Sequence, residues 1–378
     1  MNENRIWYIH LKNKLKHLMF IALLSCLWFG CNEVSDRYAP VYEFFPEAEL
    51  SHVLIEEQKI IEVRIDPVDS SGVIQTLDTM AGGDFLIHIG DSLVTVYNGR
   101  QSILILDTET GQTLGQYTFT GRGPGEYQRI DQLLYSNGYF LIVDASLGKV
   151  IRFDSRFQFL EEYEIRDMFP QSGFAYRHPL FFYPVNSDPD YLIKKLFLNN
   201  PDVNPGFHKR IISIGKQPSG YNRVLMDVNG QGDLLVTAIQ MPLLFMYGSD
   251  TSVDRLIRLH YSEFEMEEEQ VEFDQGVGQR VLVNPPPVEI ETDQVIRGRN
   301  LISGLLYRDD EVMLIHSGMI TLLRTDGNEF HHVKSIRVFD QDGEPFYPMY
   351  MAWIDDDIYL SSKFRDYIVR LDPSSLYR

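Results

Sequence analysis

Four short apolar runs follow one another between residues 85 and 119: Phe85-Leu-Ile-His-Ile89, Leu93-Val-Thr-Val-Tyr97, Ile103-Leu-Ile-Leu-Asp107 and Leu114–Phe119. Four similar runs come next: Leu133-Leu-Tyr-Ser136, Phe140-Leu-Ile-Val-Asp144, Val150-Ile-Arg-Phe-Asp154 and Phe159–Ile165. Asp107 and Asp154 end equivalent runs and lie 47 residues apart. Runs of this length between turn residues are typical of β-strands. Four strands in a period of about 45 residues are typical of one blade of a β-propeller.

A glycine-rich junction links the two units. It reads Gly121-Arg122-Gly123-Pro124-Gly125-Glu126-Tyr127, and a degenerate copy, Gly215-Lys-Gln-Pro-Ser-Gly-Tyr221, starts 94 residues later, which is two periods. Glycine permits positive φ and proline fixes a turn, so the segment suits the passage from one blade to the next. We expect Tyr127 to pack between blades. No Gly-Lys-Ser/Thr follows, which disfavours a phosphate loop.

Arg122 and Glu126 are the most distinctive polar residues of this junction. We expect them mainly to lock one blade against the next. Contact with a ligand at the seven junction residues is the second interpretation.

The rest of the chain continues the strand pattern. Further units cover about 172–215, 220–265 and 300–345, and a sixth begins near Met349 and ends one strand short. An irregular insertion, 266–297, holds the acidic run Glu267–Glu269 and the triple Pro285–Pro287.

The incomplete last unit predicts how the ring closes. An isolated strand pattern, Lys59–Ile65, precedes the first unit and is expected to complete the last blade, which leaves no long exposed sheet edge. The sequence therefore predicts an all-β chain folded as a six-bladed β-propeller with four-stranded blades, closed by an N-terminal strand that joins the last blade. A seven-bladed ring and a pair of β-sandwiches are the competing folds.

The first 31 residues resemble a bacterial lipoprotein signal. A basic leader precedes the apolar run Leu18–Phe29, which is too short to span a bilayer comfortably and ends at Gly30-Cys31. The resemblance implies cleavage before Cys31 and acyl chains, palmitate among them, on that cysteine; Cys26 and an uncleaved leader are the alternatives. The expected division is a signal peptide at 1–30, a tether at 31–51 and a propeller at 52–378.

Charge and cysteine content exclude several classes of protein. The chain carries 34 Lys and Arg against 54 Asp and Glu, a formal charge of −20. Loss of residues 1–30 would remove four cations and Glu3, leaving −23. An acidic protein of this kind does not bind nucleic acid through a generally basic surface. Cys26 and Cys31 are the only cysteines, so the rest of the chain can form neither a disulfide nor a cysteine-based zinc site.

The junction 121–127, the run Leu133–Asp144 and the strand Val150–Asp154 together resemble an NHL-type blade. With the leader, the chain resembles the six-bladed propeller lipoproteins of Gram-negative gut anaerobes. This resemblance is sharp only in the first two units. It implies the fold and a place at the outer membrane, and it implies no particular activity.

No catalytic constellation is recognisable, and we expect neither a metal ion nor a cofactor. Gly-x-Ser-x-Gly and the zinc motif with paired histidines are absent. Residues Asp355–Asp357 are expected to be solvated. The neighbours His331 and His332 should point to opposite faces if they lie on a strand. Other histidines are scattered over different units and are expected to serve surface or packing roles: His88, His178, His208, His260 and His316.

The sequence thus favours a non-catalytic propeller, anchored by lipid at the outer membrane, that binds a protein, peptide or glycan. Some of the 21 Tyr and 23 Phe could form a sugar-binding face. The alternative is a metal-dependent hydrolase or lyase with its site in the central channel.

Overall fold

The computed structural model describes residue 42 and a set of ranges from Phe45 to Leu371. These ranges are 45–64, 73–74, 84–97, 99–108, 110–165, 167–169, 173–185, 188, 190–201, 206–209, 223–248, 252–265, 301–326, 329–340, 342–354, 357–362 and 367–371. The chain divides into two units, 1–44 and 45–378, and the second holds all the strands named below. No helix in the described ranges has the length and apolar character needed to cross a membrane.

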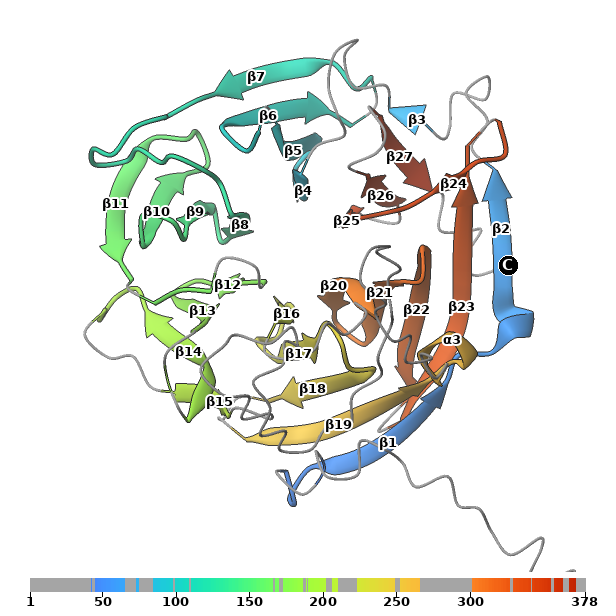
Figure 1. Cartoon of the computed structure of the whole chain (residues 1–378). Helices are drawn as coiled ribbons and strands as arrows, with labels where there is room; N and C mark the ends of the chain where they lie inside the picture. The colour runs from blue at the N-terminus through green and yellow to red at the C-terminus, as the bar shows by residue number, and fades with distance from the viewer. Residues whose placement is uncertain are drawn as a thin grey trace, which may run out of the picture. The chain divides into compact units, whose positions relative to one another are not determined.

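Six antiparallel four-stranded blades form a ring, which confirms the predicted six-bladed propeller (Figure 1). Blade 1 comprises β4 (Asp84–Ile89), β5 (Ser92–Tyr97), β6 (Ser102–Asp107) and β7 (Thr113–Tyr117). Blade 2 comprises β8 (Gln132–Ser136), β9 (Tyr139–Asp144), β10 (Lys149–Asp154) and β11 (Phe159–Glu164). Blade 3 comprises β12 (Ala175–Arg177), β13 (Leu180–Pro184), β14 (Tyr191–Phe197) and β15 (Gly206–Lys209). Blade 4 comprises β16 (Val224–Val228), β17 (Leu234–Ala238), β18 (Leu243–Tyr247) and β19 (Val253–His260). Blade 5 comprises β20 (Ile302–Arg308), β21 (Glu311–His316), β22 (Met319–Asp326) and β23 (Glu329–Phe339), to which β24 (Pro345–Phe346) is added. Blade 6 comprises β25 (Tyr350–Ile354), β26 (Asp357–Ser361), β27 (Ile368–Leu371) and β3 (Val73–Ile74).

The hydrophobic core lies between neighbouring blades. Middle strands are buried on both faces, as in β5, where the four residues Leu93–Val96 are all buried. Outer strands such as β7 are mostly exposed or half-buried. One apolar cluster joins Val96 and Ile103 of blade 1 to Phe140 and Phe153 of blade 2, and similar clusters join blades 2 and 3, 4 and 5, 5 and 6, and 6 and 1. Burial on both faces explains why the strands read as near-continuous apolar runs. A sheet with only one buried face would show alternating apolar and polar residues.

The ring closes through a different strand from the one expected. The two-residue strand β3 pairs antiparallel with β27, Ile74 opposite Ile368 and Val73 opposite Val369. The strand pattern at 59–65 forms β2 (Ile60–Arg64), which pairs in parallel with β23 and so extends blade 5. The prediction of an N-terminal closing strand is confirmed, whereas its assignment to 59–65 is wrong. The apolar pattern of β2 shows that it joins a sheet but not which sheet edge is within its reach.

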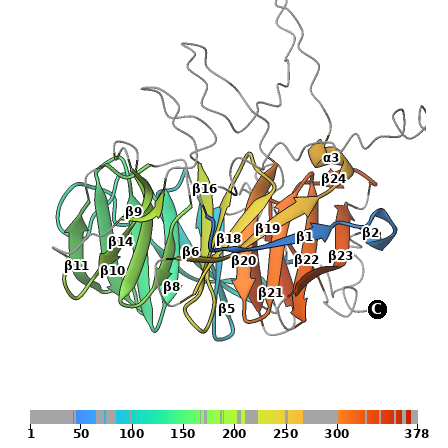
Figure 2. The same cartoon turned by 90° about the horizontal axis from the view of Figure 1, so that it is seen from below.

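An N-terminal strap, defined here as residues 49–64, runs along the outside of blades 4 and 5. It consists of β1 (Glu49–Leu54), the 3₁₀ turn η1 (Glu57–Lys59) and β2. β1 pairs in parallel with β19, and β2 does so with β23, so each blade gains an outer strand (Figure 2). The leader, most of the tether, the second junction copy at 215–221 and the insertion at 266–297 lie outside the described residues.

Candidate binding site at the channel mouth

The six inner strands surround a central channel. β4, β8, β12, β16, β20 and β25 each end their sheet, so each presents an unpaired edge toward the axis (Figure 1). The channel has a volume of about 420 Å³ and is lined by residues of all six blades. Its side chains include aromatic groups and one carboxylate: Phe85, Tyr135, Tyr176, Asp227, Tyr350 and Trp353.

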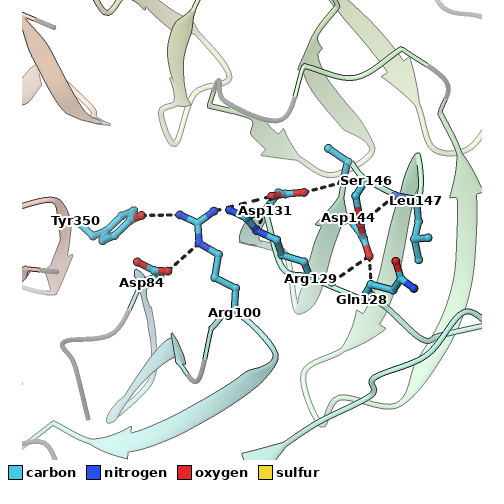
Figure 3. A network of polar contacts seen from close by, with 10 residues as sticks. Asp84, Arg100, Gln128, Arg129, Asp131, Asp144, Ser146, Leu147 and Tyr350 are labelled. Carbon is cyan, nitrogen blue, oxygen red and sulfur yellow. Dashed lines mark hydrogen bonds and ion pairs between the residues drawn. The ribbon is translucent and has the colours of Figure 1, made fainter. Parts of the chain in front are cut away.

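A polar cluster sits where β4, β8 and β25 begin. We call it the mouth cluster, and it consists of Asp84, Arg100, Arg129, Asp131 and Tyr350. Asp84 and Asp131 precede the channel-lining parts of β4 and β8, and Tyr350 itself lines the channel. The cluster therefore joins blades 1, 2 and 6 at one opening (Figure 3).

Arg100 is the centre of the mouth cluster. Its Nε donates to Asp84 Oδ2 at 2.8 Å, one Nη donates to the Tyr350 hydroxyl at 3.1 Å, and the other lies 3.9 Å from Asp131 Oδ1 (Figure 3). Its guanidinium also lies 5.3 Å from the centre of the Phe85 ring. Burial lowers the pKa of Arg100, but the hydrogen bond that Arg100 donates to Asp84 and the neighbouring charges outweigh this effect and raise the pKa overall. Arg100 is thus a fixed cation shared by three blades.

The turn that carries Arg100 explains its position. Gly99 and Arg100 connect β5 to β6 with φ of 65° and 68°, the left-handed conformation of a tight hairpin turn. The Ile130 amide donates to the Arg100 carbonyl at 2.8 Å, so blade 2 holds this turn of blade 1 from the side. Backbone geometry and the neighbouring blade together aim the guanidinium at the axis.

Asp131 and Arg129 extend the cluster over blade 2. Asp131 is nearly buried, its Oδ1 lies 3.2 Å from Arg129 Nε, and its Oδ2 accepts from the Ala145 amide at 3.0 Å. Burial raises the pKa of Asp131. The Arg129 side chain is 56% exposed, whereas that of Arg100 is 16% exposed. Arg129 is therefore the more solvent-accessible of the two cations in the cluster.

Asp144 supports this arrangement from inside blade 2. The residue is fully buried at the end of β9, and its carboxylate accepts from the amides of Gln128 (2.7 Å), Arg129 (3.2 Å) and Leu147 (3.0 Å) and from the Ser146 hydroxyl (Figure 3). A buried carboxylate with this many donors is satisfied where it lies. Its role is to position the backbone that bears Arg129.

The junction at 121–127 is mainly a support in this structure. The Glu126 carboxylate folds back and accepts from the Gly123 amide at 2.7 Å, and a Cβ on Gly121 would lie 2.0 Å from that carboxylate. Gly125 has a φ of 75° and donates to Glu162. A Cβ on Gly123 would lie 3.0 Å from the same carboxylate, and the positive φ of Gly125 favours glycine at that position.

Tyr127 connects the junction to the mouth cluster. It is fully buried in the core between blades 1 and 2, and its hydroxyl donates to the carbonyl of Gln101, the residue after Arg100, at 3.0 Å. Burial raises the pKa of Tyr127 to about 12. The tyrosine thus packs between the blades and braces the Arg100 turn.

The remaining junction residues lie at the surface. Arg122 and Pro124 are exposed. The Arg122 carbonyl accepts from Lys149 Nζ at 3.1 Å. Its guanidinium lies 2.8 Å from the Gln128 side-chain amide, whose oxygen accepts once that amide is turned over. Ligand contact by the junction stays a prediction.

The histidines singled out in the sequence include exposed, buried and channel-lining side chains. His331 is exposed and His332 is buried, which confirms that they point to opposite faces of β23. His88 lines the channel, His178 lies beside Tyr176, and His316 is fully buried. The side chain of His208 lies outside the described residues, as do Asp355 and Asp356. Asp357 pairs with Arg370. Within the described part of the chain, no three His, Cys, Asp or Glu side chains gather closely enough to hold a metal ion.

Sequence reasoning missed the mouth cluster, although one signal was present. Asp84 and Asp131 lie 47 residues apart, the same period that links Asp107 to Asp154. Each stands at the start of an inner strand. Arg100 and Tyr350 have no such counterpart, because the contacts that unite them depend on closure of the ring.

Comparison with known proteins yields similarity of structure only. No family model matches the chain, and no curated protein matches it. A candidate exported protein of Bacteroides fragilis aligns with a TM-score of 0.47 and 12% identity over 80% of this chain and 88% of that one. Virginiamycin B lyase of Staphylococcus aureus aligns with a TM-score of 0.44 and 12% identity over 78% and 96%, and a DUF4221 family member of Bacteroides vulgatus with 0.43 and 9% over 79% and 94%. Similarity at these identities does not extend to activity or ligand.

Proposed function

We propose that this chain is a lipid-anchored, non-catalytic binding module of the cell envelope that takes a protein, peptide or glycan at the mouth of its channel. The observation that carries the proposal is the mouth cluster, in which charges of both signs from blades 1 and 2 lie beside Tyr350 of blade 6, a residue that lines a channel of about 420 Å³.

The cluster has the properties of a preformed recognition site. Arg100, Asp84 and Asp131 are held by partners on two blades, so a ligand would not have to order them on binding. Exposed Arg129 offers donors for carboxylate or hydroxyl groups. The rings of Phe85 and Tyr350, whose centres are 5.0 Å apart, lie beside these charges and form an aromatic wall. Aromatic walls with a few fixed polar groups are typical of ligand pockets.

The proposed anchor rests on the leader and on Cys31. The described body begins at Phe45, so 13 residues separate it from that cysteine. Such a segment reaches about 45 Å when extended. This length would let the ring stand clear of the bilayer while acyl chains hold it there.

Binding is tested with the mature protein in detergent, screened against immobilised envelope glycans and a displayed peptide library. Arg129→Ala should lower the affinity for any selected ligand by about tenfold, because a charge-assisted hydrogen bond contributes about 1.5 kcal/mol or more to binding. Arg156→Ala is the matched control, because Arg156 is an exposed arginine in the β10–β11 turn, outside the cluster. Equal affinity of Arg129→Ala and wild type would remove the mouth cluster from the proposal.

The same preparation separates binding from catalysis. Conversion of a selected ligand, together with one equivalent of tightly held zinc or calcium, would replace the binding proposal by the metal-dependent hydrolase or lyase.

The anchor has its own test. Mass spectrometry of the mature N-terminus should find acyl chains on Cys31 in wild type and in Cys26→Ser, and none in Cys31→Ser. Retention of lipid in Cys31→Ser would refute this assignment.

A further inference from the structure

Two histidines from distant parts of the chain meet on the outside of blade 4. His52 lies on β1 of the strap and His260 ends β19. His52 Nδ1 and His260 Nε2 are 2.9 Å apart, and the two rings are stacked with centres 5.1 Å apart. His52 is exposed and His260 is half-buried.

The strand register explains the contact between His52 and His260. β1 and β19 run in parallel, with His52 opposite Arg258 and Leu54 opposite His260. Residues two apart on a strand share a face, so His52 and His260 are diagonal neighbours across the pair. The Ile55 amide donates to the His260 carbonyl at 2.8 Å, which continues the pairing past the site. Backbone bonds on both sides therefore hold the imidazoles together.

The distance between the nitrogens suits a shared transition-metal ion. Imidazole nitrogen binds zinc at about 2.0–2.1 Å, so two nitrogens at adjacent corners of a square-planar or octahedral ion lie about 2.9 Å apart. A tetrahedral ion needs about 3.4 Å, which small rotations of exposed rings supply. The formal charge of −20 favours cations over anions around the molecule as a whole.

We propose that His52 and His260 form a two-imidazole site for a divalent transition metal, Zn²⁺, Ni²⁺ or Cu²⁺, which clasps the strap to blade 4. Water fills the remaining coordination positions of the ion. Each ring must present a nitrogen lone pair to the ion, so the hydrogen that one neutral imidazole donates to the other in the metal-free pair moves to the opposite nitrogen of its own ring.

A metal ion bound to both histidines would stabilise the attachment of the strap to blade 4. The two ligands are 208 residues apart in the chain, so the bidentate site exists only while β1 lies on β19. A ligand that binds only the folded arrangement raises its stability in proportion to the logarithm of ligand concentration over Kd. This effect is independent of the mouth cluster and of lipid attachment.

The test uses untagged full-length protein, melted in chelator and then in about 100 µM ZnCl₂, NiCl₂ or CuCl₂. At least one metal should raise the Tm of wild type by about 1–3 °C, and calorimetry should give one equivalent of that metal. His52→Ala and His260→Ala should abolish the shift. His331→Ala, which removes an exposed histidine elsewhere, should keep it.

His52→Gln controls for a folding defect in His52→Ala, because glutamine keeps a polar side chain at this exposed position while lacking the imidazole. A wild type without any metal-dependent shift would overturn the proposal. So would a full shift in either His52 variant.

Discussion

Several single residues stabilise this propeller through contacts between neighbouring blades. Asp227 is an example: it lines the channel, one of its oxygens accepts from the Val228 amide at 2.9 Å, and the other accepts from the Tyr307 amide of blade 5 at 2.8 Å. It thereby ties inner strand β16 to inner strand β20. Burial raises the pKa of Asp227 to about 6 from an ordinary 3.8.

This raised pKa predicts a pH dependence that Asp227→Asn should remove. Because the folded state disfavours the ionised form, the stability contribution of Asp227 is complete below pH 3.8 and is lost as the pH rises toward 6. The free energy of unfolding of Asp227→Asn relative to wild type should therefore increase by about 2 kcal/mol between pH 4 and pH 7. Urea unfolding at both pH values measures this difference, and a constant difference would contradict it.

At the scale of elements, the strap reinforces the part of the ring with the longest connection. Blades 4 and 5 are joined through α3 (Ser262–Glu265) and residues 266–300. The strap adds one strand to each of these blades and contributes Val53 and Ile55 to the core between them. It thus links by sheet pairing two blades that the chain connects only through a long segment.

A buried hydrogen-bond chain fastens the strap to blade 5. The Glu56 amide donates to His332 Nδ1 at 2.9 Å, which places the proton of the neutral ring on Nε2, facing Ser335 Oγ at 2.9 Å. Ser335 contacts Thr321 at 2.6 Å, and Thr321 contacts His316 Nε2 at 2.6 Å. The strap is therefore connected to the interior of the blade through three strands.

His332→Ala should release the strap. Loss of the acceptor for Glu56 and of buried volume should lower the free energy of unfolding by about 2–3 kcal/mol. Hydrogen exchange in residues 49–64 should accelerate more than exchange in blades 1 and 2. His331→Ala, at the exposed neighbour, should change stability by less than about 0.5 kcal/mol. Unchanged protection of the strap in His332→Ala would show that this chain does not hold it.

For the whole molecule, closure depends on β3, a strand of only two residues. Its pairing with β27 gives blade 6 its fourth strand and joins the N-terminal part of the chain to the C-terminal blade. Without it, the outer edge of β27 would be left unpaired.

Proline substitutions made singly at Val73 and Ile74 test this closure. Neighbouring residues of an edge strand direct their amides to opposite sides, so only one of the two amides faces β27. Proline at that position removes a hydrogen bond to β27, so it should cost about 1–3 kcal/mol and lower Tm, whereas proline at the other position should be tolerated better. Alanine at each position keeps the amide and serves as the control. Two prolines with equally small effects would mean that this pairing does not close the ring.

By itself, the sequence determined the blades of this protein. Strand composition and the period of 47 residues act locally, and they were sufficient to predict an all-β six-bladed ring with an N-terminal closing strand. Which N-terminal segment closes it, and that the segment at 59–65 instead extends blade 5, was decided by sheet edges that exist only in the assembled ring. The mouth cluster and the His52–His260 pair were decided in the same way, because Arg100 with Tyr350, and β1 with β19, are separated by 200 residues or more and meet only when distant blades pack. Strand periodicity reports burial along a chain, and contacts between its distant parts arise from the geometry of the closed fold.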